Sequence, residues 1–118
     1  MHSVAPLKPV IAKELLDRVD VRVGTIRAVE DVAGSKKLAR LTVDIGDRTL
    51  RVLAGIRGER ENPQELAGRQ ALFVVNLEPR RMAGEVSEAM LFDIGYADGI
   101  RPALAVPEFA VPDGARAG

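Results

Sequence analysis

Between Asp20 and Ile56 the sequence contains segments in which apolar and polar side chains alternate with a period of two, and no other feature constrains the fold as tightly. The clearest case is the segment 40–45, in which every second residue is apolar. Gly46-Asp47 follows as a tight connection, and Thr49 to Ile56 returns as the partner strand. This pattern predicts a β-hairpin that buries one face in a core.

Further strands are predicted on both sides of this hairpin. The first starts at Asp20, and Gly24, where its alternation changes phase, is typical of a bulge or a sharp coil. After the hairpin, Asn62 as an N-cap and Pro63 at the first helical position predict a short helix. The last two strands are predicted at residues 69–77, which contain a run that is apolar on both faces, and at residues 87–95.

This order of elements is that of the five-stranded OB barrel, which has a small helix between its third and fourth strands. We therefore predict an all-β OB-fold domain over residues 20–95. Residues 1–19 are predicted to form a lead-in with a short helix at Val10–Asp17, and residues 96–118 a C-terminal extension. In OB folds, strands two and three, with the loops after strands one and four, hold oligonucleotides or oligosaccharides.

The composition favours binding over catalysis. The chain has 118 residues, which suits a single core, and its lack of cysteine excludes disulfides and thiolate chemistry. Its one histidine, His2, lies near the N-terminus, and its acidic residues follow no metal-binding motif. We therefore expect no cofactor, no metal site and no enzymatic activity.

The same sequence predicts a cytoplasmic protein. No apolar run approaches the roughly 20 residues that a membrane span needs. The first residues lack the charged-then-apolar layout of a signal peptide. The absence of cysteine is compatible with a reducing compartment.

The loop between the fourth and fifth predicted strands carries two adjacent arginines, Arg80 and Arg81, between Pro79 and Gly84. Guanidinium groups present forked donors that match phosphate oxygens, so this loop is a candidate phosphate-binding element. A solvated loop, or an ion pair with Glu78 or Glu85, is the alternative interpretation.

A second group of basic residues lies near the second and third predicted strands: Lys36, Lys37, Arg40 and Arg51. The formal net charge is zero, but basic residues outnumber acidic ones from Arg18 to Arg60 and the reverse holds from Glu61 onward. Such a distribution can give one attractive face for a polyanion, although charge on an exposed strand face is also common.

Several segments together resemble the small tRNA-binding domain family. These are DVRVGTI (20–26), LTVDIGD (41–47), VLAGI (52–56), PQELAGRQALFVVNLEPRRMAG (63–84) and SEAM (87–90). Members of this family are OB-fold modules appended to methionyl-tRNA synthetases, modules of synthetase cofactors, and free-standing bacterial dimers that include CsaA-type secretion chaperones. Ala89 stands where the family often has glycine.

The resemblance implies a free-standing homodimer that binds tRNA, with the N-terminal helix and the tail after Gly95 as its interface. Because aromatic residues are few, recognition is expected to use tRNA shape and phosphates more than stacked bases. The resemblance also implies an aminoacyl-tRNA synthetase as a partner, and it implies no association with a membrane. The predicted tRNA-binding residues are Asn76, Arg80, Arg81, Ser87, Glu88, Lys36, Lys37, Arg40 and Arg51.

Alternatives remain for this assignment. The CsaA-type resemblance implies a chaperone that binds unfolded preproteins in a peptide groove near Met82 and Met90. Met90 is also a candidate for core or interface packing. Asn76 is expected to satisfy the end of a strand as well, and a turn-capping role suits Ser87 equally.

Overall fold

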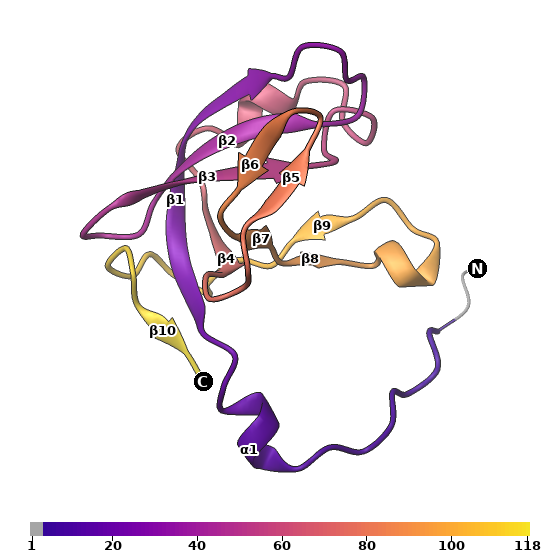
Figure 1. Cartoon of the computed structure of the whole chain (residues 1–118), viewed down its shortest axis with the longest axis vertical. Coiled ribbons are helices and arrows are strands. Elements are labelled where there is room, and N and C mark those ends of the chain that lie inside the picture. Colours follow the sequence, from indigo (N-terminus) through magenta and orange to yellow (C-terminus); the bar gives the residue numbers. More distant parts are fainter. Residues whose placement is uncertain (1–3) are drawn as a thin grey trace.

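Five antiparallel strands form a nearly closed barrel (Figure 1). The computed structural model describes residues 4–118, so His2 lies outside the described residues. The sheet order is β3-β2-β1-β4-β7, built from β1 (Val21–Asp31), β2 (Ala39–Asp44), β3 (Thr49–Ala54), β4 (Gln70–Val74) and β7 (Met90–Leu91). This confirms the predicted all-β OB barrel, including its β2–β3 hairpin.

The barrel is closed between β3 and the segment that precedes β7. The amide of Glu88 donates to the carbonyl of Arg51 at 2.8 Å. The amide of Leu53 donates to the hydroxyl of Ser87 at 3.0 Å, within a buried environment. Side-chain and main-chain bonds therefore replace a regular ladder at this seam.

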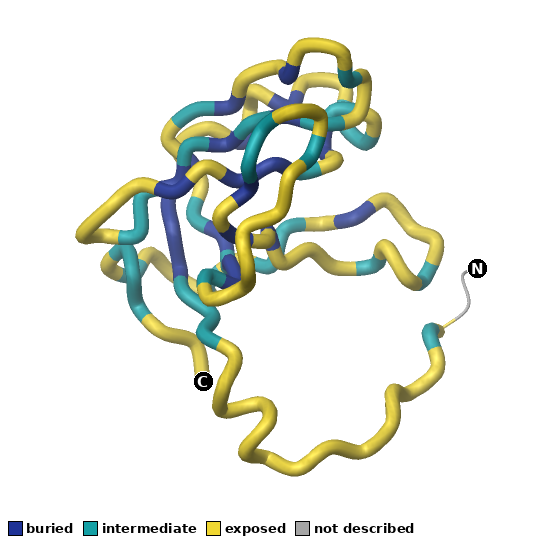
Figure 2. Tube along the Cα trace, in the orientation of Figure 1, coloured by how far each residue is buried: buried dark blue, intermediate teal, exposed yellow. Residues whose placement is uncertain are grey.

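An aliphatic core fills the barrel around one aromatic ring, and Figure 2 shows the buried positions following the barrel strands. Alternate residues of β2 are buried, as the period-two pattern predicts. The largest fully buried side chains are Phe73, Ile26, Leu41, Ile56, Val43 and Val52.

Strand β1 is long and coiled, but its irregularity does not lie at the predicted residue. The register with β2 shifts between Ile26 and Ala28, so the bulge lies beyond Gly24, where a bulge or a sharp coil was predicted. Gly24 is needed for a different reason: a Cβ atom there would lie 2.5 Å from Cγ1 of Val43. The glycine lets β2 approach β1 closely where the sheet coils.

The predicted short helices occur in reduced form. Between β3 and β4 there is a single 3-10 turn, η1 (Pro63–Leu66), which buries Pro63 and Leu66. Asn62 occupies the N-cap position, as predicted, but its side chain makes no capping hydrogen bond. The N-terminal helix α1 (Lys13–Leu16) is also shorter than predicted, because none of its residues is buried against the barrel.

The region predicted as one loop and one fifth strand is broken into smaller pieces. The loop folds into a hairpin of β5 (Arg80–Met82) and β6 (Glu85–Ser87). Its turn is Ala83-Gly84, where both residues have positive φ. The expected fifth strand is divided into the end of β6, the barrel strand β7 and the separate strand β8 (Asp93–Ile94).

The C-terminal extension packs on the barrel along two edges. Strand β8 pairs with β9 (Ala103–Leu104) to form a ribbon that also contains η2 (Tyr96–Asp98). Farther along, β10 (Arg116–Ala117) pairs with the start of β1, and Gly114 donates to the carbonyl of Val23 at 2.7 Å. The tail thus covers the part of the β1 edge that β2 leaves free.

The N-terminal arm, residues 4–19, extends away from the barrel and returns toward η2 (Figure 1). The amide of Ala5 donates to Asp98 at 2.7 Å, which holds the start of the arm near the ribbon. Most of the arm is exposed, including its apolar residues. Within residues 4–118, no helix has the length and apolar character needed to cross a membrane.

Candidate nucleic-acid interface

The hairpin β5–β6 lies over the outer face of β2 and β3 and presents a different set of side chains on each of its own faces. Cross-strand partners share a face, so Arg80 lies with Ser87 and Met82 lies with Glu85. This face is turned toward the barrel, because Ser87 bonds Leu53 of β3. Arg81 and its partner Val86 lie on the opposite, outward face.

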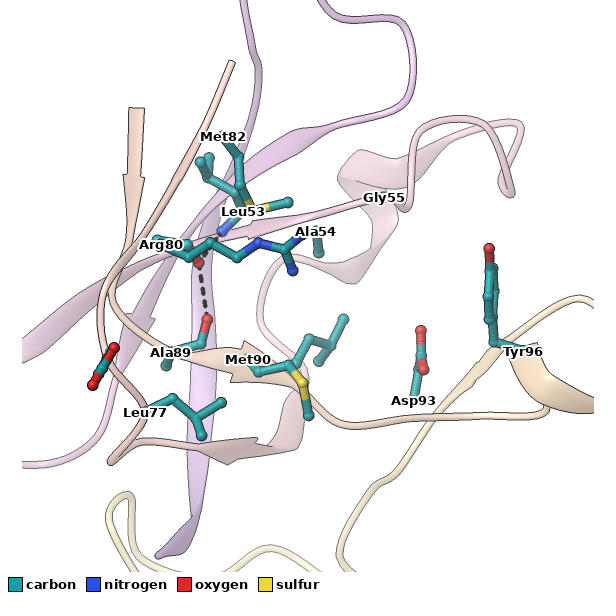
Figure 3. Close-up of a pocket in the computed structure, with 13 residues that line it drawn as sticks. Leu53, Ala54, Gly55, Leu77, Arg80, Met82, Ala89, Met90, Asp93 and Tyr96 are labelled. Carbon is teal, nitrogen blue, oxygen red and sulfur yellow. Dashed lines mark hydrogen bonds between the residues drawn. The ribbon is translucent and has the colours of Figure 1, made fainter. Parts of the chain in front are cut away.

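A pocket of about 350 Å³ opens between this hairpin, β3 and the β8–η2 ribbon (Figure 3). The barrel-facing residues Arg80, Met82 and Ser87 line it on the hairpin side. Of the predicted site residues it also brings in Met90, so candidates for tRNA binding and for peptide binding meet in one place. Leu53, Ala54, Gly55, Leu77, Glu78, Ala89, Leu91, Asp93 and Tyr96 complete the lining.

Two of these lining residues carry polar or aromatic groups that the sequence did not single out. Asp93 and Tyr96 come from the β8–η2 ribbon, and Figure 3 shows them across the pocket from the Arg80 guanidinium. Leu53 contributes to the floor and is buried. In the sequence, a tyrosine beside Gly95 is only a weak indication of a binding site. The neighbours of Tyr96 become apparent only from the position of the β8–η2 ribbon.

Of the two carboxylates considered as partners for the arginine pair, Glu78 and Glu85, the second is bonded to another residue. Glu85 accepts from Arg40 at 2.8 Å, and Arg40 also lies 3.6 Å from Glu30. The hydrogen bond that Arg40 donates to Glu85, together with the charge of that carboxylate, raises the pKa of Arg40. Arg80 and Arg81 are both exposed on the hairpin. Arg40 therefore fastens the hairpin to β2, while Arg81 faces outward and Arg80 is exposed where it lines the pocket.

Three further predicted residues are bonded into the framework of the site. Asn76 accepts from the amide of Asp20 at 2.8 Å and donates to the carbonyl of Arg18 at 2.7 Å. Ser87 both accepts from Leu53 and donates to the carbonyl of Ala89 at 2.9 Å. Glu88 accepts from the amide of Arg51 at 2.8 Å. Their contacts with RNA stay predictions, and their structural roles are clear.

The remaining predicted cations lie outside the pocket. Lys36 and Lys37 are exposed on the loop between β1 and β2, and Arg51 is exposed on β3. Arg57 donates its amide to the carbonyl of Lys37 at 3.0 Å, which ties this loop to the chain after β3. The structure thus separates these cations into a loop pair and a strand position rather than one cluster with Arg80.

A second depression, of about 250 Å³, lies beside β1 and the β2–β3 turn. The arginines that line it form ion pairs with carboxylates of the same depression. Asp20 accepts from Arg22 at 2.8 and 3.1 Å and from Arg116 at 3.2 Å. The hydrogen bonds from Arg22 are the main reason why the pKa of Asp20 lies below its ordinary value. Because its cations already have carboxylate partners, this depression suits an anion less well than the hairpin does.

Comparison with known proteins gives consistent results. The family model described as "putative tRNA binding domain" matches residues 21–116. Methionine–tRNA ligase of Chlorobium chlorochromatii is 42% identical over 98 residues, which are 83% of this chain and 14% of that protein. A methionine–tRNA ligase of Methanopyrus kandleri is also 42% identical, over 72% of this chain and 13% of that enzyme. The chain thus spans about one seventh of the length of these relatives.

Solved structures of similar proteins match nearly the whole chain. A MetRS-related protein from Pyrococcus horikoshii has a TM-score of 0.86 and 29% identity, and the match covers 94% of this chain and all of that one (100%). The chaperone CsaA from Bacillus anthracis has a TM-score of 0.80 and 28% identity, with coverage of 93% and 100%.

Proposed function

This chain belongs to the putative tRNA-binding domain family, and on that premise we propose that it binds tRNA, without catalysis, as a free-standing OB-fold homodimer. The observation that carries the proposal is the β5–β6 hairpin, which exposes Arg80 and Arg81 on a support fastened to the barrel. Forked guanidinium donors on a rigid base suit a phosphate backbone, where contacts set affinity more than sequence choice.

The proposed homodimer is supported by the exposed apolar residues of the N-terminal arm. Leu7 and Val10 are 100% and 99% exposed, and Leu15 and Leu16 of α1 are 50% and 61% exposed. A surface with this many exposed apolar side chains is more often a protein–protein interface than a surface that stays in contact with solvent. In this proposal, residues 1–19 and 96–118 flank the OB domain of residues 20–95 and provide the interface. Two grooves side by side would offer one longer surface for tRNA.

A second candidate function is that of a chaperone for unfolded preproteins. The apolar part of the pocket favours it, since Met82 and the 45% exposed Met90 form an adaptable surface beside Leu53. A protein named as the chaperone CsaA has the same fold over nearly the whole chain. In this alternative, the hairpin arginines would contact the peptide backbone or acidic side chains.

One titration series separates the two functions. Purified protein is titrated with bulk tRNA and with a reduced, unfolded preprotein at several salt concentrations, and its mass is measured by light scattering. The tRNA proposal expects a dimer whose tRNA affinity falls steeply with salt, because phosphate contacts release counterions. Salt-insensitive binding of the preprotein alone would reject tRNA binding in favour of the chaperone function.

The cellular setting follows from the same proposal. A tRNA-binding module acts where tRNA is aminoacylated, so we place the protein in the cytoplasm. An aminoacyl-tRNA synthetase is the partner class that fits a module whose relatives include methionine–tRNA ligases. Co-purification of a synthetase with tagged protein, with and without ribonuclease, tests whether the contact is direct or runs through tRNA.

A further inference from the structure

We infer that the pocket beneath the β5–β6 hairpin holds a single unpaired nucleobase that carries an exocyclic amino group. This inference rests on the proposed binding of tRNA, and it assigns to the pocket a role separate from phosphate contact. The base would come from a single-stranded position of the bound RNA, since a paired base cannot leave its stack without cost.

The size and floor of the pocket suit one flat ring system. A volume of about 350 Å³ is near the lower limit for small-molecule sites, and the pocket is open to solvent, as a base attached to a chain requires. The floor is apolar, with Leu53, Leu91 and the half-exposed Met90. A base laid on this floor would remove apolar surface from water on both partners.

The rim supplies the groups that a base can use at its edge and face. Tyr96, 75% exposed, offers an aromatic ring on which the base can stack, a contact worth about 1–3 kcal/mol per base. Asp93 stands beside it with its carboxylate turned to the pocket (Figure 3). Across the opening, Arg80 places a guanidinium that can donate to ring nitrogens, carbonyl oxygens or the adjoining phosphate.

The carboxylate of Asp93 gives the pocket a preference among the bases. Ionised carboxylates only accept hydrogen bonds, so Asp93 favours a base edge with an amino donor, as in adenine, cytosine or guanine. Uracil presents one ring N–H between two carbonyl oxygens, and these oxygens would face the carboxylate unfavourably. An apolar peptide side chain would leave both Asp93 and Arg80 without a hydrogen-bond partner at the rim of the pocket.

Mononucleotides are the probes for this inference, with bulk tRNA binding measured in parallel. We expect AMP, CMP or GMP to shift the NMR resonances of Tyr96 and of the Met82 and Met90 methyl groups, and UMP to bind at least about threefold more weakly. Tyr96→Ala should abolish the methyl shifts and weaken tRNA binding about 5- to 10-fold, in line with the loss of one stacked base. Asp93→Asn, which loses the charge and gains an amide donor, should weaken tRNA binding less and remove the preference against UMP.

Matched control variants lie elsewhere on the surface. Phe109→Ala removes an exposed ring, and Asp47→Asn removes an exposed carboxylate on the β2–β3 turn. Asp47→Asn should leave nucleotide and tRNA binding unchanged, and Phe109→Ala, which lies in the proposed dimer interface, should leave nucleotide binding unchanged.

The outcomes separate the pocket from the proposed function. Unchanged tRNA affinity in Tyr96→Ala and Asp93→Asn, or equal binding of UMP, overturns the base pocket while tRNA binding stands. Pocket shifts caused by an apolar peptide and by no nucleotide also overturn it. Selective nucleotide shifts in a protein that fails to bind bulk tRNA would support the pocket and reject the proposed function.

Discussion

Arg80 and Arg81 are neighbours in the sequence, yet they lie on opposite faces of strand β5. Arg80 lines the pocket against the barrel, and Arg81 shares the outer face with Val86. Consecutive residues of a strand point to opposite sides, so the two guanidiniums do not form one paired anion site. They offer two separate positions along a bound backbone.

Charge reversal of both arginines tests the hairpin as the phosphate-binding element. The double variant Arg80→Glu with Arg81→Glu should abolish tRNA retention on filters, while the melting temperature changes little because both side chains are exposed. Arg81→Ala alone should weaken binding to all RNAs. It should also make the slope of log affinity against log salt concentration less steep by about 1. Undiminished tRNA binding by the double variant would rule out the hairpin.

The hydroxyl of Ser87 closes the seam between β3 and β6, so its removal should destabilise the barrel. Ser87→Ala leaves the buried amide of Leu53 without an acceptor, and we expect a loss of about 1–3 kcal/mol in the free energy of unfolding. Urea denaturation measures this loss. Ser35→Ala is the control, because the Ser35 hydroxyl accepts from the amide of Leu38 in a partly exposed loop, and less than about 1 kcal/mol is expected. Equal stabilities of the two variants would contradict the structural role of Ser87.

Periodicity predicted the barrel well because it reports which face of each strand is buried. The alternating segments at β2 and β3 and the doubly apolar run of β4 appear as expected. The same reasoning failed for Arg80 to Ser87, where no alternation announces a three-residue strand and the turn depends on positive φ at Ala83-Gly84. Sequence reasoning therefore treated a hairpin as a loop.

The pocket was only partly predictable for a related reason. Arg80, Met82, Ser87 and Met90 were singled out from one continuous stretch. Asp93 and Tyr96 reach the same pocket through the β8–β9 pairing, a contact between segments with no local signature. Arg40 was predicted to bind RNA from its type and strand alone, and its ion pair with Glu85, which is 45 residues away, depends on tertiary structure.

Gly24 offers a test of how closely β1 and β2 approach. In Gly24→Ala the added methyl group would lie 2.5 Å from Cγ1 of Val43, so side chains or strands must shift. We expect a loss of about 1–3 kcal/mol in unfolding free energy, typical of overpacking. Gly55→Ala is the matched control, since nothing lies within 4 Å of its added Cβ. A Gly24→Ala protein as stable as Gly55→Ala would show that the strands separate without cost.

The carboxylate of Asp20 links the start of β1 to the tail and should make stability depend on pH. The two hydrogen bonds from Arg22, and then the bond from Arg116, lower the pKa of Asp20 below its ordinary value of 3.8. A lowered pKa in the folded state means that the carboxylate stabilises the fold above that ordinary value. This contribution is lost as the pH falls through the folded pKa, because the folded state must then take up a proton.

Asp20→Asn should therefore be less stable than the parent protein at neutral pH, by about 1–2 kcal/mol for a partly buried group with charged hydrogen bonds. The difference should shrink as the pH is lowered below 3.8, where Asp20 of the parent also loses its charge. Urea unfolding at a series of pH values measures both quantities. Asp47→Asn is the control, because its ion pair with Arg48 spans 3.4 Å between largely exposed side chains and contributes little at any pH. A difference between Asp20→Asn and the parent that stays constant down to acidic pH would mean that Asp20 acts through its shape and not through its charge.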